Sequence, residues 1–213
     1  MLELAQLSAF YGQAQALFGV SLRVAAGEMV VLQGLNGAGK STLLKAIMGL
    51  EVRTEGAIRC QQPSGSVAIE RWETHRRARA GLGYVAEDRR LFSELTVREN
   101  LHVAAGRDAK AHEARALDLF PVLKTLLNRP AAQMSGGQQQ MLAIARTLMT
   151  GPKILLLDEP CEGIAPVLVE SIRDALLVLR REGMALLVVE QNRLLASRAD
   201  RLLWLVAGKV RDS

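Results

Sequence analysis

Residues 34 to 41 read Gly-Leu-Asn-Gly-Ala-Gly-Lys-Ser, and this segment is the strongest indication of the fold class. It matches the phosphate-loop pattern, in which spaced glycines are followed by lysine and a hydroxyl residue. The apolar run Met29 to Leu32 before it predicts a buried strand, and from Lys40 apolar residues recur at helical spacing until Gly49. A strand, a glycine loop and a helix in this order can surround a phosphate with backbone N–H groups and the positive end of a helix.

The loop supplies the first candidate binding residues. Lys40 would place a positive charge at the terminal phosphates, where it would also assist catalysis, and the Ser41 hydroxyl is placed to bind Mg²⁺. A glycine turn that merely caps a helix is the alternative, and the strand before it makes that interpretation weaker. The predicted nucleotide-binding residues of this segment are Gly34, Asn36, Gly37, Ala38, Gly39, Lys40, Ser41 and Thr42.

A second segment places two carboxylates at the end of an apolar strand. Ile154 to Leu157 predicts a buried parallel strand, and Asp158 and Glu159 follow directly. Taken alone, this is an ordinary solvated strand end. Together with the phosphate loop it predicts a metal and water site, in which Asp158 holds Mg²⁺ and Glu159 orients or deprotonates the attacking water.

The third segment, residues 134 to 138, reads Met-Ser-Gly-Gly-Gln. Ser135 is a good N-cap residue, and the two glycines expose backbone N–H groups at the start of the next helix, as in a second anion-binding turn. A routine helix cap is the alternative. With this segment lying between the other two, the chain resembles the ATP-binding subunits of ABC transporters over nearly its whole length.

This resemblance implies a phosphate-loop ATPase with ATP and Mg²⁺ as cofactors. It implies an α/β core with a mostly parallel sheet, antiparallel N-terminal strands and an inserted helical lobe. It also implies that two subunits pack head to tail, so that Ser135, Gly136, Gly137 and Gln138 close over ATP held by the other subunit. We therefore expect one ABC ATPase domain over residues 1–213, with its core at about 1–85 and 150–213 and its lobe at about 86–149.

The apolar patterns agree with this organisation. Alternation at Val20, Leu22 and Val24 predicts a half-buried strand, and residues 185–189 predict a buried one. Between Gln61 and Asn128 strand patterns are weaker, and helical spacing occurs over residues 97–105 and 109–127. We interpret this middle part as mainly helical.

Four further positions follow from the resemblance. Tyr11 is similar to the aromatic residue that stacks on adenine, and Glu87 stands where most of the family has a glutamine that contacts Mg²⁺. Gln191 stands where a histidine normally senses the γ-phosphate, and Ala165 replaces a usual aspartate. Gln191 can donate a hydrogen bond but cannot carry a positive charge, so the site is expected either to hydrolyse ATP with a weaker sensor or mainly to bind it.

These departures are typical of importers for branched-chain or other hydrophobic amino acids, and importers of urea and short amides are an alternative. The resemblance implies a second, similar or identical ATPase chain, integral-membrane permease subunits and an external substrate-binding protein as partners. It places the chain in the cytoplasm, peripherally on the inner face of the cell membrane.

The composition restricts the classes of protein to which this chain can belong. The 213 residues are 49% hydrophobic, which excludes disorder as the main state, and 27 basic against 22 acidic residues give a net charge of +5. The longest apolar runs are far shorter than the roughly 20 residues of a membrane-spanning helix, and the N-terminus lacks a signal-peptide pattern. Two widely spaced cysteines suit a reducing compartment.

The basic stretch from Arg71 to Arg90 has few interleaved aromatics, so we interpret it as a solvated face and expect no nucleic-acid partner. Two functions other than transport nevertheless remain open from the sequence. A soluble ATPase of the same fold that acts on nucleic acid or ribosomes is one alternative. A nucleotide sensor without useful hydrolysis is the other.

Overall fold

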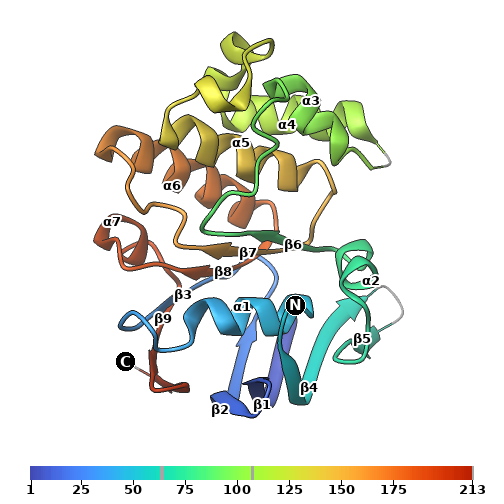
Figure 1. Cartoon of the computed structure of the whole chain (residues 1–213), viewed down its shortest axis with the longest axis vertical. Coiled ribbons are helices and arrows are strands. Elements are labelled where there is room, and N and C mark those ends of the chain that lie inside the picture. Colours follow the sequence, from blue (N-terminus) through green and yellow to red (C-terminus); the bar gives the residue numbers. More distant parts are fainter. Residues whose placement is uncertain (63–64, 107, 213) are drawn as a thin grey trace.

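The computed structural model describes residues 1–62, 65–106 and 108–212. Two β-sheets lie on either side of helix α1 (Lys40–Met48), and most of the other helices cover the far face of the larger sheet (Figure 1). The site described below lies where the loop before α1 meets the ends of the larger sheet's strands.

The smaller sheet is antiparallel, with strand order β2-β1-β4-β5. Its strands are β1 (Leu2–Tyr11), β2 (Ala14–Val24), β4 (Arg53–Gln62) and β5 (Gly65–Ala68). Buried Val20, Leu22 and Val24 alternate with exposed residues along β2, as predicted. A tight turn at Gly12 joins β1 to β2 and leaves Tyr11 at the very end of its strand.

The larger sheet has strand order β10-β9-β3-β8-β7-β6 and is parallel except for β10. Its strands are β3 (Met29–Gln33), β6 (Leu82–Val85), β7 (Ile154–Asp158), β8 (Ala185–Val189), β9 (Arg201–Val206) and β10 (Lys209–Asp212). Every residue of β7 and β8 is buried, because helices cover one face of these strands and α1 covers the other. Parallel pairing brings the carboxyl ends of β3, β7 and β8 to one edge.

The larger sheet divides the apolar core into two clusters. One surrounds α1 between the two sheets and contains Leu43, Leu44 and Ile47, and the other lies between the larger sheet and helices α5 and α6. The remaining helices are α2 (Thr74–Arg79), α3 (Val97–Val103), α4 (Ala109–Leu119), α5 (Gly136–Leu148), α6 (Pro166–Arg181) and α7 (Arg193–Ala196), with 3₁₀ turns at Pro121–Leu126 and Ala131–Gln133.

Three sequence-based interpretations need correction. The helix expected over 109–127 ends at Leu119, because Phe120 leaves the helical conformation and Pro121 cannot continue the hydrogen-bond pattern. The middle stretch from Gln61 is less helical than expected, since β5 and β6 lie within it. The basic stretch is not wholly solvated, because Arg77 is only 3% exposed.

Helices α3, α4 and α5 all fall within residues 86–149, but the proposed division into core and lobe stays a prediction. Across the ranges that the structure describes, helices long and apolar enough to cross a membrane are absent.

Candidate functional site

The phosphate loop connects β3 to α1 in the predicted way, and two of its glycines are required by space. A Cβ at Gly34 would lie 2.3 Å from the carbonyl oxygen of Leu205. Gly39 has φ of 103°, and a Cβ there would lie 2.9 Å from the Leu17 side chain. Larger residues would push this loop away from β2 and β9.

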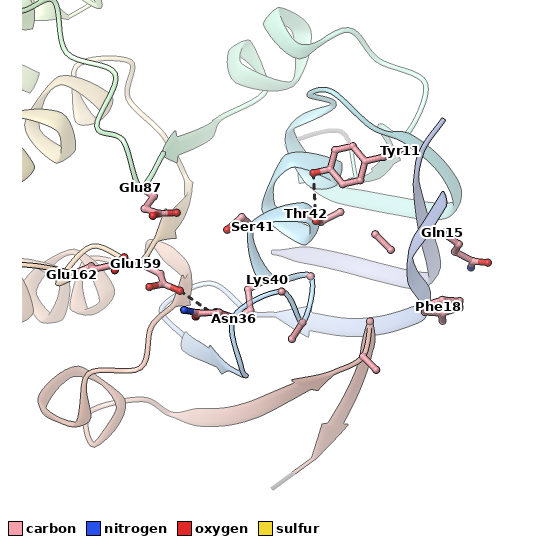
Figure 2. A pocket seen from close by; sticks show the side chains of 16 residues that line it. Tyr11, Gln15, Phe18, Asn36, Lys40, Ser41, Thr42, Glu87, Glu159 and Glu162 are labelled. Carbon is pink, nitrogen blue, oxygen red and sulfur yellow. Dashed lines mark hydrogen bonds and ion pairs between the residues drawn. The ribbon is translucent and has the colours of Figure 1, made fainter. Parts of the chain in front are cut away.

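Lys40 is almost fully buried and has only oxygen partners. Its Nζ donates to the carbonyl oxygen of Gly34 at 2.9 Å and to that of Leu35 at 3.4 Å. It also forms an ion pair with Glu159 Oε1 at 3.2 Å (Figure 2). The amine thus lies where phosphate oxygens can replace these partners.

Asp158, at the carboxyl end of β7, lies against Ser41. The Ser41 hydroxyl donates to Asp158 Oδ1 at 3.0 Å, and the Tyr84 hydroxyl of β6 donates to Oδ2 at 3.2 Å. Burial raises the pKa of Asp158 above its usual range, although these two hydrogen bonds act in the opposite direction. Burial is also the main reason why the pKa of Tyr84 is raised.

The phosphate loop lines a cavity of about 620 Å³, and three glutamates line it as well. Figure 2 shows Glu87, Glu159 and Glu162 on the side opposite Tyr11, with Lys40 and Ser41 between. Glu159 has φ of 44°, a strained conformation of the kind that occurs at functional sites. The Glu159 carboxylate, by hydrogen bonding and by its charge, holds the pKa of Glu162 above its usual range.

The charge of the cavity fits a divalent cation. One lysine and three glutamates line it, which gives 1 − 3 = −2 if all are ionised. A polyphosphate would be repelled by this charge without a cation beside it. The Ser41 hydroxyl and the Asp158 carboxylate are oxygen ligands of the kind that Mg²⁺ uses together with phosphates and water, and Glu87 lines the space next to both.

Tyr11 lies at the other end of the cavity, 42% exposed, with its hydroxyl 3.4 Å from Thr42 Oγ1. Its ring is therefore available to a planar base. Five residues near this end of the cavity were not indicated by the sequence patterns, and the exposed ring of Phe18 is the largest of their side chains. They are Gln15, Ala16, Phe18, Ala207 and Gly208. Continued back from Val20, the alternation of β2 would place Phe18 on the buried face. A register shift between Leu17 and Val20 turns it outward, so the sequence pattern gave no signal for it.

Gln191 approaches the phosphate loop from the end of β8. Its Nε2 donates to Asn36 Oδ1 at 3.1 Å, and it lines a neighbouring cavity with Gly34 and Leu35. The preceding residue, Glu190, is buried and accepts hydrogen bonds from the backbone N–H groups of Cys161, Gln191 and Asn192. This carboxylate, which sequence analysis also missed as a structural residue, fixes the direction of Gln191.

The Ser-Gly-Gly-Gln segment opens helix α5 and does not line the cavity. Ser135 Oγ accepts from the backbone N–H of Gln138, and Gln138 Oε1 accepts from the backbone N–H of Ser135. This capping box holds the first turn of the helix in shape. One chain thus brings together the phosphate loop, Tyr11, Asp158, Glu159 and Glu87, but not the residues of this turn.

Fold and site together define a phosphate-loop protein built to hold a nucleoside triphosphate and to position water against it. A family model described as "ABC transporter" matches residues 17–162, and the chain belongs to the ABC transporter family as one of its ATPases.

Curated relatives cover nearly the whole chain. It is 42% identical to the high-affinity branched-chain amino acid transport ATP-binding protein BraG of Pseudomonas aeruginosa, over 99% of this chain and 91% of that protein. It is 36% identical to the probable branched-chain amino acid transport ATP-binding protein LivF of Archaeoglobus fulgidus, over 99% and 90%. The glutamate/aspartate import ATP-binding protein GltL of Escherichia coli is 35% identical, over 99% and 89%.

Solved structures show the same fold. A nucleotide-free ATP-binding cassette from an ABC transporter superposes with a TM-score of 0.87 at 27% identity, covering 100% of this chain and 92% of that one. The dimeric bacterial ABC transporter cassette MJ0796 gives 0.86 at 26% identity, covering 100% and 98%. These matches confirm the α/β phosphate-loop fold expected from the sequence.

Proposed function

We propose that this chain is the ATP-hydrolysing subunit of an importer for branched-chain or other hydrophobic amino acids. The observation that carries the proposal is the 42% identity to a branched-chain amino acid transport subunit over 99% of the chain. We place the chain in the cytoplasm, at the inner face of the cell membrane, because its partners would be membrane permeases.

The geometry supports the following chemistry. ATP would lie in the 620 Å³ cavity with adenine against Tyr11 and its phosphates in the loop from Gly34 to Thr42. Lys40 would exchange its contacts with Glu159 and the loop carbonyls for phosphate oxygens, which frees Glu159 to accept a proton from water. Mg²⁺, held by Ser41 and by Asp158 with Glu87 nearby, would neutralise phosphate charge.

Gln191 would serve as a neutral hydrogen-bond donor to the γ-phosphate. It already reaches the phosphate loop through Asn36, so a small side-chain movement would suffice. We propose that the turn of Ser135, Gly136, Gly137 and Gln138 completes the site of a second chain, because this turn lies outside the cavity of its own chain. Two chains would then close head to tail over two ATP molecules.

A groove between α1, α2 and α5 is our proposed docking place for a permease. It has a volume of about 270 Å³, and its lining includes the apolar side chains of Met48, Leu50 and Leu82 together with Arg146. Tyr84, which bonds Asp158, also lines it. A permease segment in this groove would contact a side chain that touches the metal site.

Trapping of the closed pair tests the ATPase mechanism. Glu159→Gln removes the proposed base and is expected to lower ATP hydrolysis at least about 100-fold, while ATP binding persists. Size-exclusion chromatography with ATP should then show a dimer that the parent chain does not accumulate. Turnover at the wild-type rate would remove Glu159 from this role.

Transport assays test which substrate the importer carries. Deletion of the gene in its native cells should abolish uptake of radiolabelled leucine, and only the wild-type chain, not Lys40→Ala, should restore it. Tagged Glu159→Gln chain, purified from native membranes with MgATP, should copurify with two permease subunits. Loss of urea uptake instead, or copurification of ribosomes or nucleic acid, would contradict the proposal.

A further inference from the structure

The loop after β6 carries two consecutive arginines whose side chains go to different partners. Arg89 Nε donates to Gln140 Oε1 at 3.1 Å, and its Nη1 donates to Gln139 Oε1 at 3.2 Å. Arg90 instead forms ion pairs with Asp88 and Glu51. Arg89 therefore joins this loop to helix α5, and Arg90 does not.

The Arg89 guanidinium lies beside the residue that opens α5. A Cβ at Gly136 would lie 3.5 Å from both Nη1 and Nη2 of Arg89. The backbone is tied as well, because Arg146 of α5 donates to the carbonyl oxygen of Arg89 at 3.1 Å. Loop and helix are thus connected at the first turn of α5 and again two turns later.

Three features of this contact are energetically unfavourable. Arg89 has φ of 61°, in the left-handed region that a long side chain rarely adopts. Gln140 directs its oxygen to Arg89, and its Nε2 is buried with no hydrogen-bond partner among the described residues. A positive charge at the N-terminus of a helix opposes the helix dipole. An anion facing this end of α5 would offset the last of these costs.

We propose that Arg89 is a positioning residue for the ATP-bound pair of chains. It holds the first turn of α5 in place and links that turn to the loop of Glu87, which lines the nucleotide cavity. Movement of the loop is thereby passed to the Ser-Gly-Gly-Gln turn. The inference rests on the proposed head-to-tail pairing, in which this turn faces the phosphates of the second chain.

The test compares Arg89→Ala with Arg90→Ala, both in the Glu159→Gln background. The two positions share a loop, a positive φ and the same loss of charge, so Arg90→Ala is a matched control. Two quantities are measured: ATP affinity of the monomer at low protein concentration, and the ATP concentration that gives half-maximal dimer by chromatography.

For Arg89→Ala we expect unchanged monomer affinity and a requirement for about tenfold more ATP to dimerise, as for loss of a charge-assisted hydrogen bond. Arg90→Ala should match the parent. Arg89→Lys keeps the charge but loses the forked contact, and it should restore part of the dimerisation. Equal dimerisation of Arg89→Ala and Arg90→Ala would overturn the proposal.

Hydrogen exchange on the nucleotide-free chain separates this inference from the pairing on which it rests. Arg89→Ala should speed exchange of the Gln139 and Gln140 backbone amides about tenfold, and Arg90→Ala should not. If the Glu159→Gln chain itself stays monomeric with ATP, this would contradict the pairing and with it the role in dimerisation. Unchanged exchange in Arg89→Ala would overturn the contact itself.

Discussion

At the residue scale, Lys40 and Asp158 have polar partners before any nucleotide arrives. Lys40 is neutralised by Glu159, and Asp158 accepts hydrogen bonds from Ser41 and Tyr84. Burial of a charged group away from water is unfavourable, and the ion pair and hydrogen bonds offset part of this cost and hold the side chains in position. In the proposed mechanism, nucleotide binding would exchange these partners without rebuilding the geometry of the site.

The buried thiol of Cys161, two residues after Glu159, gives a pH-dependent prediction. Burial, and next the Glu190 carboxylate, raise the pKa of Cys161 far above its ordinary value of 9.0. The folded thiol should stay protonated at pH 8.5, so iodoacetamide should label a Cys60→Ser variant only after unfolding in urea. Because the unfolded thiol ionises first, the free energy of unfolding should fall as pH rises above about 9.

Rapid labelling of the folded Cys60→Ser chain at pH 8.5 would contradict this burial. A Cys60→Ser/Cys161→Ser double variant is the control for labelling at other side chains. Its free energy of unfolding should also lose the component of the pH dependence that Cys161 supplies.

At the element scale, helix α1 depends on contacts at both ends. Gly39 supplies the left-handed residue before its first turn, and Gly49 ends it. Arg77 then covers the C-terminus: its Nη1 donates to the carbonyl oxygens of Ala46 and Ile47. Its other nitrogens donate to the carbonyl oxygens of Glu70 and Trp72, so one side chain fixes α1 to the segment before α2.

Removal of this buried guanidinium should therefore destabilise the whole chain. We expect Arg77→Ala to lower the free energy of unfolding by about 3 kcal/mol, because buried carbonyls lose their donors. The neighbouring Arg76 is exposed and stacks over Trp72 at 4.1 Å, so Arg76→Ala should cost at most about 1 kcal/mol. Urea denaturation compares the two, and equal midpoints would show that Arg77 is not a structural contact.

At the scale of the whole molecule, the proposed catalytic site is divided between two chains. Parallel strands bring one half together at a sheet edge, and helix α5 carries the other half away from it. Each chain would therefore supply a phosphate loop to one site and a Ser-Gly-Gly-Gln turn to the other.

Complementation between two inactive variants tests this division. Lys40→Ala removes the phosphate-loop charge, and Ser135→Asp keeps a good N-cap but places a negative charge toward the partner's phosphates. Each variant alone should be inactive, whereas an equal mixture should recover roughly a quarter of wild-type ATPase activity, because half of the pairs are mixed and each has one intact site. A mixture as inactive as its components would argue against a shared site.

Much of this fold follows from local sequence patterns. The apolar runs Met29–Leu32, Ile154–Leu157 and Ala185–Val189 are too continuous for surface strands, and each forms a central strand of the larger sheet. The loop from Gly34 to Ser41 has the predicted position because its spacing is a local backbone requirement. Local sequence patterns were therefore enough to predict the fold class, the phosphate loop and the two carboxylates at the end of β7.

Which distant side chains contact one another depends on the packing of the elements and could not be predicted from the sequence. Arg77 and Arg89 lie in one basic stretch, yet one is buried under α1 and the other holds α5, because each is placed by partners far along the chain. Phe18, Glu162 and Glu190 likewise acquire their positions from neighbouring strands and loops. The spacing of apolar residues indicates which face of a helix or strand is buried. A hydrogen bond between two elements depends in addition on how those elements pack.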